Sequence, residues 1–325
     1  MLLNLWDEEL STDFMRLYNI SPLQMCNILK QLMLNNDKDN IIIFCEETGL
    51  KLDAINVVDD DLEFVGKIVS TTIDNCAYLK KNGLIPIDML LEQPSPIQKH
   101  LKSHKIEIIP SMHELIYMDK HYFIPSWNQD CQYCAYTENK CRYSQHQYKD
   151  MYCPYLGAIS NLSTKLYSHK SEIEMFLAAS QDTMLSYSRV IDCPEMLSTI
   201  EDFIYDFFYK RTDLCSDWEK QKQYSYIITF SIKYNDMSYR TNYVDNKHYA
   251  EASNTLYNYE NYCQNVYYDI DQVPKCFWDN VWLISTCLSV IGSFGKINGE
   301  ICAGMKHNLT IPYNKLNIEI IPNNP

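Results

Sequence analysis

The chain has 325 residues, of which 46% are hydrophobic and 22% are charged, an ordinary mixture for a globular protein with a sizeable core. A formal net charge of -14 disfavours broad contact with nucleic-acid phosphates, because such binding relies on clustered Lys and Arg. The N-terminal segment has neither the basic nor the long apolar region of a signal peptide, and no apolar run is long enough to span a membrane, so we expect a cytoplasmic protein.

Residues 1–38 are predicted to form a helical cap that contains two helices between residues 7 and 35. The second helix begins with Ser21 as N-cap and Pro22 at its first position. Its expected buried face carries Leu23, Cys26, Leu29 and Met33. We assign the remaining residues, 39–325, to a single α+β domain.

The first part of this domain alternates strands and short helices. Ile41 to Cys45 and Phe64 to Thr72 are predicted as strands, and Asp74 to Asn82 as a helix that ends at Gly83. Ser95 is a suitable N-cap for a helix over Pro96 to Ser103. Two strand-like segments are predicted to follow, at Ile106 to Ile109 and at Leu115 to Ile124. The second contains a hairpin turn at Asp119-Lys120.

The second part is predicted to contain further strands and two longer helices. Strands are predicted at Glu172 to Ala178, Tyr224 to Tyr234, Glu300 to Met305 and Leu316 to Ile321, and helices at Pro194 to Tyr209 and Phe277 to Ile291. Residues 224–268 hold eleven tyrosines. Tyrosines in this number would suit a stacking surface for bases or sugars, but the chain is also rich in Asn, Ile and Lys, so we favour coding bias together with the ordinary preference of Tyr for strands.

Four cysteines predict a metal site. Cys131, Cys134, Cys141 and Cys153 are separated by two, six and eleven residues, and four thiolates at such spacings can surround one zinc ion. Segment 127–157 is poor in aliphatic residues, so we expect an inserted zinc ribbon or knuckle that the metal stabilises. Four thiolates leave no coordination position for a reacting water, which indicates a structural ion. An iron–sulfur cluster has the same ligands, and His146 is an alternative to one cysteine.

Several common catalytic motifs are missing from the sequence. It contains no GxxxxGK[ST] or GxGxxG loop and no HExxH or GxSxG motif. Cys193 precedes Pro194 at a predicted helix start, where a thiol can be activated, but with no histidine nearby it is interpreted as a buried structural cysteine.

The segment Thr71-Thr-Ile-Asp-Asn-Cys-Ala-Tyr-Leu-Lys-Lys-Asn-Gly83-Leu84 resembles the first conserved block of NAD-dependent ADP-ribosyltransferases, a superfamily with toxin, polymerase and DNA-targeting members. In that family a strand that ends in His-x-Thr is followed by a helix and then by Gly-Leu. The resemblance implies an ADP-ribosyltransferase-like split sheet, with NAD bound near Ser70 and Thr71.

Later segments fit the order of the same family. Tyr187 stands where an aromatic ring often stacks on nicotinamide, and Glu300-Ile-Cys-Ala-Gly resembles the start of the late strand that opens with the catalytic glutamate. The resemblance implies that this glutamate holds a ribose hydroxyl and stabilises the cationic sugar that develops as nicotinamide leaves. Residues Ile311-Pro312-Tyr313 follow in the same late region.

The sequence departs from the family pattern at one position. Val69 occupies the place of the histidine that binds the NAD ribose, and valine cannot donate a hydrogen bond. Either Ser70 or another residue substitutes, or the fold survives without the activity.

From the resemblance as a whole we expect an NAD-dependent transferase acting on a macromolecule, in a bacterial toxin or phage-defence role. The alternative is a noncatalytic zinc-containing binding protein that recognises a protein or nucleic acid.

Overall fold

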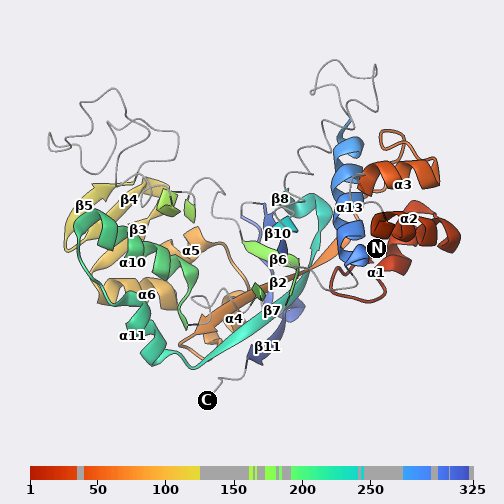
Figure 1. The fold of residues 1–325 in the computed structure, drawn as a ribbon. Coiled ribbons are helices and arrows are strands. Elements are labelled where there is room, and N and C mark those ends of the chain that lie inside the picture. The colour runs from red at the N-terminus through yellow and green to blue at the C-terminus, as the bar shows by residue number, and fades with distance from the viewer. Residues whose placement is uncertain are drawn as a thin grey trace, which may run out of the picture. The chain divides into compact units, whose positions relative to one another are not determined.

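The computed structural model describes residues 1–34, 40–124, 161–163, 165–166, 173–180, 183–184, 192–240, 243–244, 274–293, 299–306 and 308–321. Over these residues the protein is a mixed α+β structure with a split antiparallel sheet. Its elements are drawn in Figure 1. The chain packs as two compact units. Unit 1 comprises Met1–Lys67, Glu174–Met184 and Phe230–Ala303, and unit 2 comprises Ile68–Ile173, Leu185–Thr229 and Gly304–Pro325.

The helices of the described residues vary in length from about one and a half to five turns. Those in unit 1 are α1 (Leu10–Tyr18), α2 (Pro22–Leu34), α3 (Asn40–Thr48) and α13 (Lys275–Gly292). Those in unit 2 are α4 (Ala77–Asn82), α5 (Ile87–Glu92), α6 (Pro96–Ser103), α10 (Glu195–Phe208) and α11 (Leu214–Gln221). Short 3-10 turns occur at η1 (Pro110–Met112), η4 (Tyr234–Asp236) and η6 (Tyr313–Lys315).

Eight strands of the described residues form the main sheet, in the order β11-β7-β2-β6-β10-β8, with β1 beside β2 and β9 beside β10. Their bounds are β1 (Leu2–Leu3), β2 (Glu63–Thr72), β6 (Glu174–Ala179), β7 (Tyr224–Lys233), β8 (Met237–Arg240), β9 (Tyr243–Val244), β10 (Gly299–Met305) and β11 (Asn317–Ile321). Strands β2–β6, β9–β10 and β7–β11 pair antiparallel, whereas β1 and β2 are parallel. The division between the units falls within β2, β7 and β10.

In unit 1 the apolar core surrounds α13. This helix contacts α1, α2 and α3, as Figure 1 shows. The rings of Phe14 and Tyr18 on α1 pack against Phe44 of α3 at centroid distances of 5.8 and 5.2 Å. Phe64 of β2 packs edge-on against Trp282 of α13. Burial of such aromatic surfaces is the main source of stability in a core of this kind.

In unit 2 a second sheet supports a separate core. Strands β3 (Ile106–Ile109), β4 (Glu114–Tyr117) and β5 (Lys120–Phe123) form an antiparallel meander. Met118 and Asp119, between β4 and β5, both have positive φ, as a two-residue hairpin turn requires. Buried residues of β3 and β4 join those of α6, α10 and α11 in one cluster, which includes Ile108, Leu115, Leu197, Phe207 and Trp218.

Most predicted elements match the structure to within a few residues, and two predicted helix starts show why. Ser21 Oγ accepts from the Gln24 backbone N–H, and Gln24 Oε1 accepts from the Ser21 backbone N–H, which forms a capping box before α2. Ser95 Oγ accepts from the Gln98 backbone N–H at 3.0 Å before α6. Both caps are local in sequence, so they are visible without tertiary information.

Three predictions of local structure need correction. Ile41 to Cys45, predicted as a strand, lies within helix α3. The buried face of α2 carries Met25 and Ile28, whereas Leu23 and Met33 are 71% and 68% exposed. Pro194 is the N-cap of α10 rather than its first helical residue. A short apolar run fits a buried helix as well as a strand, and in α3 contact with α2 and α13 selects the helix.

Two further predictions are not decided by the described residues. The zinc insertion at 127–157 lies outside them. The division into a cap at 1–38 and a single domain at 39–325 stays a prediction. No helix within the described residues is long and apolar enough to cross a membrane.

Candidate functional site

The segment Thr71–Leu84, which carries the family resemblance, begins at the end of β2 with an ordered turn. Thr72 Oγ1 accepts from the backbone N–H groups of Asp74 and Cys76 at 3.1 and 3.2 Å. Asp74 Oδ2 accepts from the Tyr78 backbone N–H at 2.8 Å. These side chains satisfy the free donors at the start of α4, where no N-cap side chain does so. The turn therefore holds the Asp74 carboxylate against the first turn of α4, at the backbone of Tyr78.

Two residues of this turn have left-handed backbone conformations. Asn75 and Cys76 have φ values of 55° and 57°, which are unfavourable for residues with a Cβ. The Tyr224 hydroxyl donates to Asn75 Oδ1 at 2.6 Å and helps to hold this conformation. Burial, followed by contact with Cys76, raises the pKa of Tyr224 to about 12, so this phenol is a donor at neutral pH. Backbone strain of this kind is commonly found at functional sites.

The strand residues before the turn are oriented in different ways. Thr71 is 4% exposed, and its Oγ1 accepts from the Trp218 indole N–H at 2.7 Å. Val69, in the family's histidine position, is 5% exposed. Ser70 is half-buried. Of the two residues expected to bind NAD, Thr71 thus uses its hydroxyl within the core, and Ser70 is the more accessible.

The Gly83-Leu84 pair connects this segment to the late part of the chain within unit 2. Leu84 and Ile311 form an antiparallel bridge, with N–H···O distances of 2.8 and 2.9 Å. Gly83 has φ 72°, and a Cβ there would lie 2.2 Å from the Ile311 carbonyl oxygen. A side chain at position 83 is therefore excluded by both conformation and space. The glycine is required so that the backbone of Ile311 can approach the end of α4.

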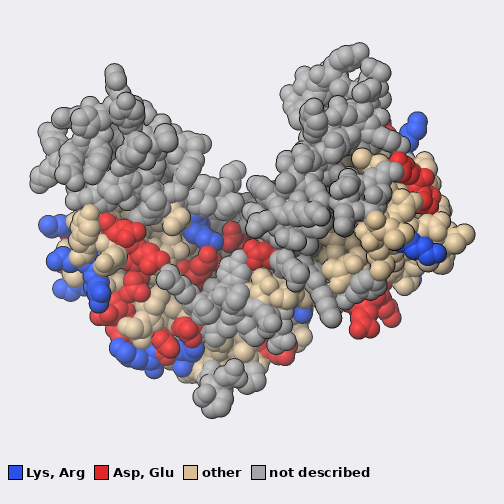
Figure 2. Space-filling view, viewed as in Figure 1, with Lys and Arg blue, Asp and Glu red and all other residues tan. Residues whose placement is uncertain are grey.

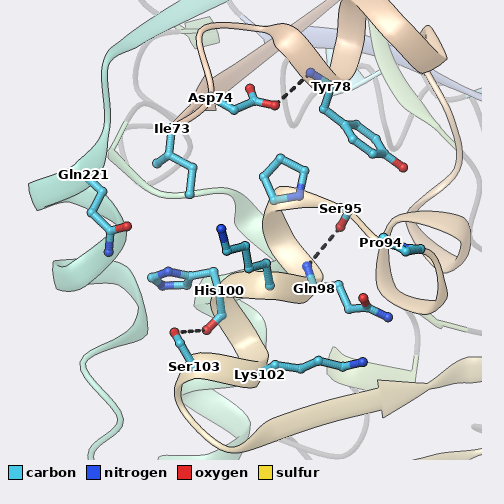
Figure 3. A pocket seen from close by; sticks show the side chains of 12 residues that line it. Ile73, Asp74, Tyr78, Pro94, Ser95, Gln98, His100, Lys102, Ser103 and Gln221 are labelled. Atoms are coloured by element: carbon cyan, nitrogen blue, oxygen red, sulfur yellow. Dashed lines mark hydrogen bonds between the residues drawn. The ribbon is translucent and has the colours of Figure 1, made fainter.

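A surface pocket of about 730 Å³, which we call the α6 pocket, adjoins the same turn. Figure 3 shows Asp74 and Tyr78 on one side and residues of α6 on the other. Its polar lining includes Ser95, Gln98, Lys99, Lys102 and Gln221, and its apolar lining includes Ile73, Pro94 and Pro96. This volume and mixture of groups suit a small molecule with both a planar and a charged part.

The wall of the α6 pocket is fixed by histidines packed against α11. His100 is 4% exposed, its Nε2 lies 2.9 Å from the Leu214 carbonyl oxygen, and its ring meets the Trp218 ring edge-on. Burial lowers the pKa of His100, and because the Leu214 carbonyl oxygen can only accept, Nε2–H is the donor in that hydrogen bond. His104 contacts Asp217 at 3.2 Å, and hydrogen bonds from Lys220 and then His104 lower the pKa of Asp217.

Glu300 lies on β10 in unit 1. It pairs with Tyr243 of β9 in antiparallel register, and its side chain is half-buried. Ser70 and Thr71 belong to unit 2, and Tyr187 lies outside the described residues. That Glu300, Thr71 and Tyr187 serve one NAD site, as the resemblance implies, therefore stays a prediction.

The four predicted zinc ligands, Cys131, Cys134, Cys141 and Cys153, also lie outside the described residues. Within the ranges that the structure describes, no group of three or more His, Cys, Asp or Glu side chains is arranged to hold a metal ion. The zinc site stays a prediction from the cysteine spacing.

The distribution of charged residues and the exposure of tyrosines indicate whether the described residues offer a surface for nucleic acid. On the face shown in Figure 2, Lys and Arg of the described residues are interspersed with Asp and Glu and form no continuous basic surface. In the tyrosine-rich stretch, Tyr226 and Tyr234 are 7% and 1% exposed, so both belong to the core. Neither ring is available to stack on a base.

Sequence reasoning missed three residues of this site: Asp74 as a cap, Tyr78 as pocket lining, and Trp218 as the partner of Thr71. Thr72-x-Asp74 followed by a helix is a turn pattern that identifies the cap. The spacing of Leu214 and Trp218 fits one helix face, but no local signal pairs Trp218 with Thr71, 147 residues away.

No protein-family model, curated protein or solved structure matches the chain.

Proposed function

We propose that this protein is an NAD-dependent transferase with an ADP-ribosyltransferase-like split sheet, acting on a macromolecule in a bacterial toxin or phage-defence role. The observation that carries the proposal is the antiparallel backbone bridge between Leu84, in the Gly83-Leu84 pair of the first block, and Ile311 of the late region. The Gly83-Leu84 pair comes after a strand, a turn and a helix, in the order that the resemblance implies. A chance occurrence of Gly-Leu in the sequence would not require this contact.

The proposed reaction breaks the glycosidic bond between nicotinamide and ribose. A nucleophile of the macromolecule forms the new bond to the ribose carbon, and nicotinamide leaves with the electron pair of the broken bond. The carboxylate of Glu300 is the group we assign to stabilising the developing positive charge on the sugar. Such a reaction depends more on positioning than on acid–base power.

The α6 pocket supports binding of a dinucleotide close to the first block. Lys99 and Lys102 are exposed at the pocket and carry the charge that phosphates require, and Lys102 also forms an ion pair with Glu107 at 3.1 Å. Tyr78 offers an aromatic ring at the other side (Figure 3). Ser70 is the residue we assign to the ribose contact that Val69 cannot make.

The test is incubation of the purified chain with NAD labelled on its adenylate part and with a cell lysate, followed by measurement of label transfer. Glu300→Gln should reduce transfer by at least about a hundredfold, because a charged transition state loses its carboxylate. Glu319→Gln is the matched control, since Glu319 is an exposed carboxylate on β11. Equal transfer by the two variants would contradict the role of Glu300.

A second function, that of a noncatalytic binding protein, is favoured by one specific observation. Val69 is buried, and the Thr71 hydroxyl is already bonded to Trp218, so neither contributes a free group to NAD. This reading predicts that folded protein releases no nicotinamide from NAD in any lysate and gives the same result as Glu300→Gln. Release of nicotinamide by the wild-type chain would exclude it.

We also propose that Cys131, Cys134, Cys141 and Cys153 hold one structural zinc ion in either case. Elemental analysis of protein prepared without chelator should find about one zinc per chain. Cys134→Ser should lose the metal and melt at a lower temperature, whereas the exposed Cys26→Ser should change neither property. A brown protein that contains iron would identify an iron–sulfur cluster instead.

A further inference from the structure

Two cysteines meet where the helices α10 and α11 begin. Cys193 immediately precedes the N-cap of α10, and Cys215 lies in the first turn of α11. Their Sγ atoms are 2.7 Å apart. Cys193 is 2% exposed, and Cys215 is half-buried and packed against the same apolar cluster. The two thiols are thus in direct contact, and one of them is accessible from outside.

The surrounding structure holds both sulfurs in place. Glu201 of α10 accepts from the Leu214 backbone N–H at 2.8 Å, from the Cys215 backbone N–H at 3.4 Å and from the Thr212 hydroxyl at 3.2 Å. The carboxylate therefore fixes the start of α11 against α10. This arrangement restricts both cysteines before any bond forms between them, which favours ring closure over reaction with separate molecules.

We propose that Cys193 and Cys215 form a dithiol site that a small-molecule disulfide oxidises reversibly to an intramolecular disulfide. The accessible Cys215 loses its proton to solvent and its thiolate attacks one sulfur of the small disulfide, forming a mixed disulfide and releasing one small thiolate. Cys193 then loses its proton and attacks the Cys215 sulfur, which releases the second small thiolate. The two protein thiols are oxidised, and one small disulfide is reduced to two thiols.

Both cysteines of the pair are free thiols in the structure. Contact with Cys193, burial and the Glu201 carboxylate all raise the pKa of Cys215, so only a small thiolate fraction attacks at neutral pH, and the oxidation should be slow there and faster as the pH rises. The bond, once formed, would tie the start of α10 to the start of α11. It closes a loop between residues 22 positions apart, and closing such a loop stabilises the folded chain.

The experiment is peptide mapping of the full native chain after equilibration with oxidised glutathione, with free thiols then blocked by N-ethylmaleimide. Trypsin separates the two cysteines at Lys210 and Arg211, giving peptides 190–210 and 212–220 with one cysteine each. We expect these two peptides to be linked, and dithiothreitol to separate them. The linked protein should melt about 5 °C or more above the reduced protein.

Variants and alternative outcomes complete the test. Cys215→Ser should abolish both the link and the shift in melting temperature, whereas Cys276→Ser, at a half-buried cysteine in unit 1, should retain both. Glutathione attached to other cysteines, with Cys193 and Cys215 unlinked in the wild-type chain, would overturn the proposal. Linkage of either cysteine to several other cysteines in comparable yield would overturn it as well.

Discussion

Unit 1 and unit 2 each place polar side chains beneath the surface, but with different neighbours. In unit 1 a polar hub lies on α13. Asn280 is 0% exposed, donates to the Leu52 and Ile55 carbonyls at 2.7 Å each, and accepts from the Tyr18 hydroxyl at 3.0 Å. In unit 2 the Thr71–Leu84 segment uses Thr72 and Asp74 to cap a helix beside the open α6 pocket.

The difference concerns what remains available to a ligand. The Asn280 side chain is buried and forms hydrogen bonds with Tyr18 and with the Leu52 carbonyl. These bonds hold the loop at Leu52 against α1 and α13. The capping residues of unit 2 also bond to the protein, yet they border a cavity of about 730 Å³ with exposed lysines. Buried polar groups alone therefore indicate architecture. A binding site requires that such groups also face a cavity.

The largest expected effect tests the closed character of the hub. Asn280→Leu keeps the number and branching of the side-chain heavy atoms but removes the hydrogen bonds to two buried partners and one part-buried partner, so the free energy of unfolding should fall by about 4 kcal/mol. Asn235→Leu is the control, because the Asn235 side chain donates to an exposed Asp60 carboxylate at 3.1 Å, and it should lose under about 1 kcal/mol. Urea unfolding measures both. Similar losses would show that the hub is not a special point of unit 1.

The next effect tests whether the Thr71–Leu84 segment is as rigid as the hub. Gly83→Ala should lower the free energy of unfolding by about 3 kcal/mol, since the new methyl group meets the Ile311 carbonyl at 2.2 Å. Gly49→Ala shares a positive φ, 68°, but meets nothing within 4 Å, and should lose only about 1 kcal/mol. The same loss at both positions would mean that the bridge to Ile311 yields easily.

A smaller effect concerns the buried hydrogen bond between Trp218 and Thr71. Trp218→Phe and Thr71→Val should each lower the free energy of unfolding by about 1–2 kcal/mol, because each leaves one buried polar group unpaired. The double variant should lose about 1 kcal/mol less than the sum of the single losses. Thermal or urea unfolding of the four proteins measures this coupling. Strict additivity would contradict the hydrogen bond.

The smallest effect is a difference in pH dependence between the two regions. Burial lowers the pKa of His100 below its ordinary value of 6.5, so the unfolded chain binds more protons than the folded chain in the window below that value. The free energy of unfolding should therefore fall by under about 1.4 kcal/mol per pH unit as the pH drops through this window. His100→Gln should flatten this slope. An unchanged slope would assign it to other groups.

The hub should respond at the opposite end of the pH scale. Burial raises the pKa of Tyr18 well above 10.0, so the unfolded chain loses this proton first as the pH rises, and stability falls above about pH 10. Tyr18→Phe should reduce this alkaline response, and Tyr224, whose pKa is also raised, should account for part of what remains. Unfolding curves between about pH 9 and 11 measure it.

Local sequence signals explain the part of the fold that could be predicted. Ser21, Gly83 and Ser95 mark helix ends through contacts within a few residues, so α2, α4 and α6 were predictable. The strand β2 and the hairpin of β4 and β5 follow from alternation and turn residues. Helix α3 was not predictable, because its isoleucines are buried against α2 and α13 rather than on a sheet.

The site was predictable only in part. Thr71, Gly83 and Leu84 are recognisable because their spacing along the chain matches the first block of the resembled family. The α6 pocket brings together residues 73–78, 94–103 and Gln221, and the hydrogen bond of Trp218 spans 147 positions. Such contacts depend on tertiary packing and leave no periodic trace in the sequence.

The polar hub joins parts of the chain that are synthesised at very different times. Tyr18 and Asn280 are 262 positions apart, so helices α1 to α3 leave the ribosome long before α13 exists to cover them. During that interval the rings of Phe14 and Phe44, fully buried in the folded protein, have no α13 to pack against. Unit 1 therefore completes its core only after most of unit 2 has been made, and until then its N-terminal helices lack the cover that α13 gives them in the folded protein.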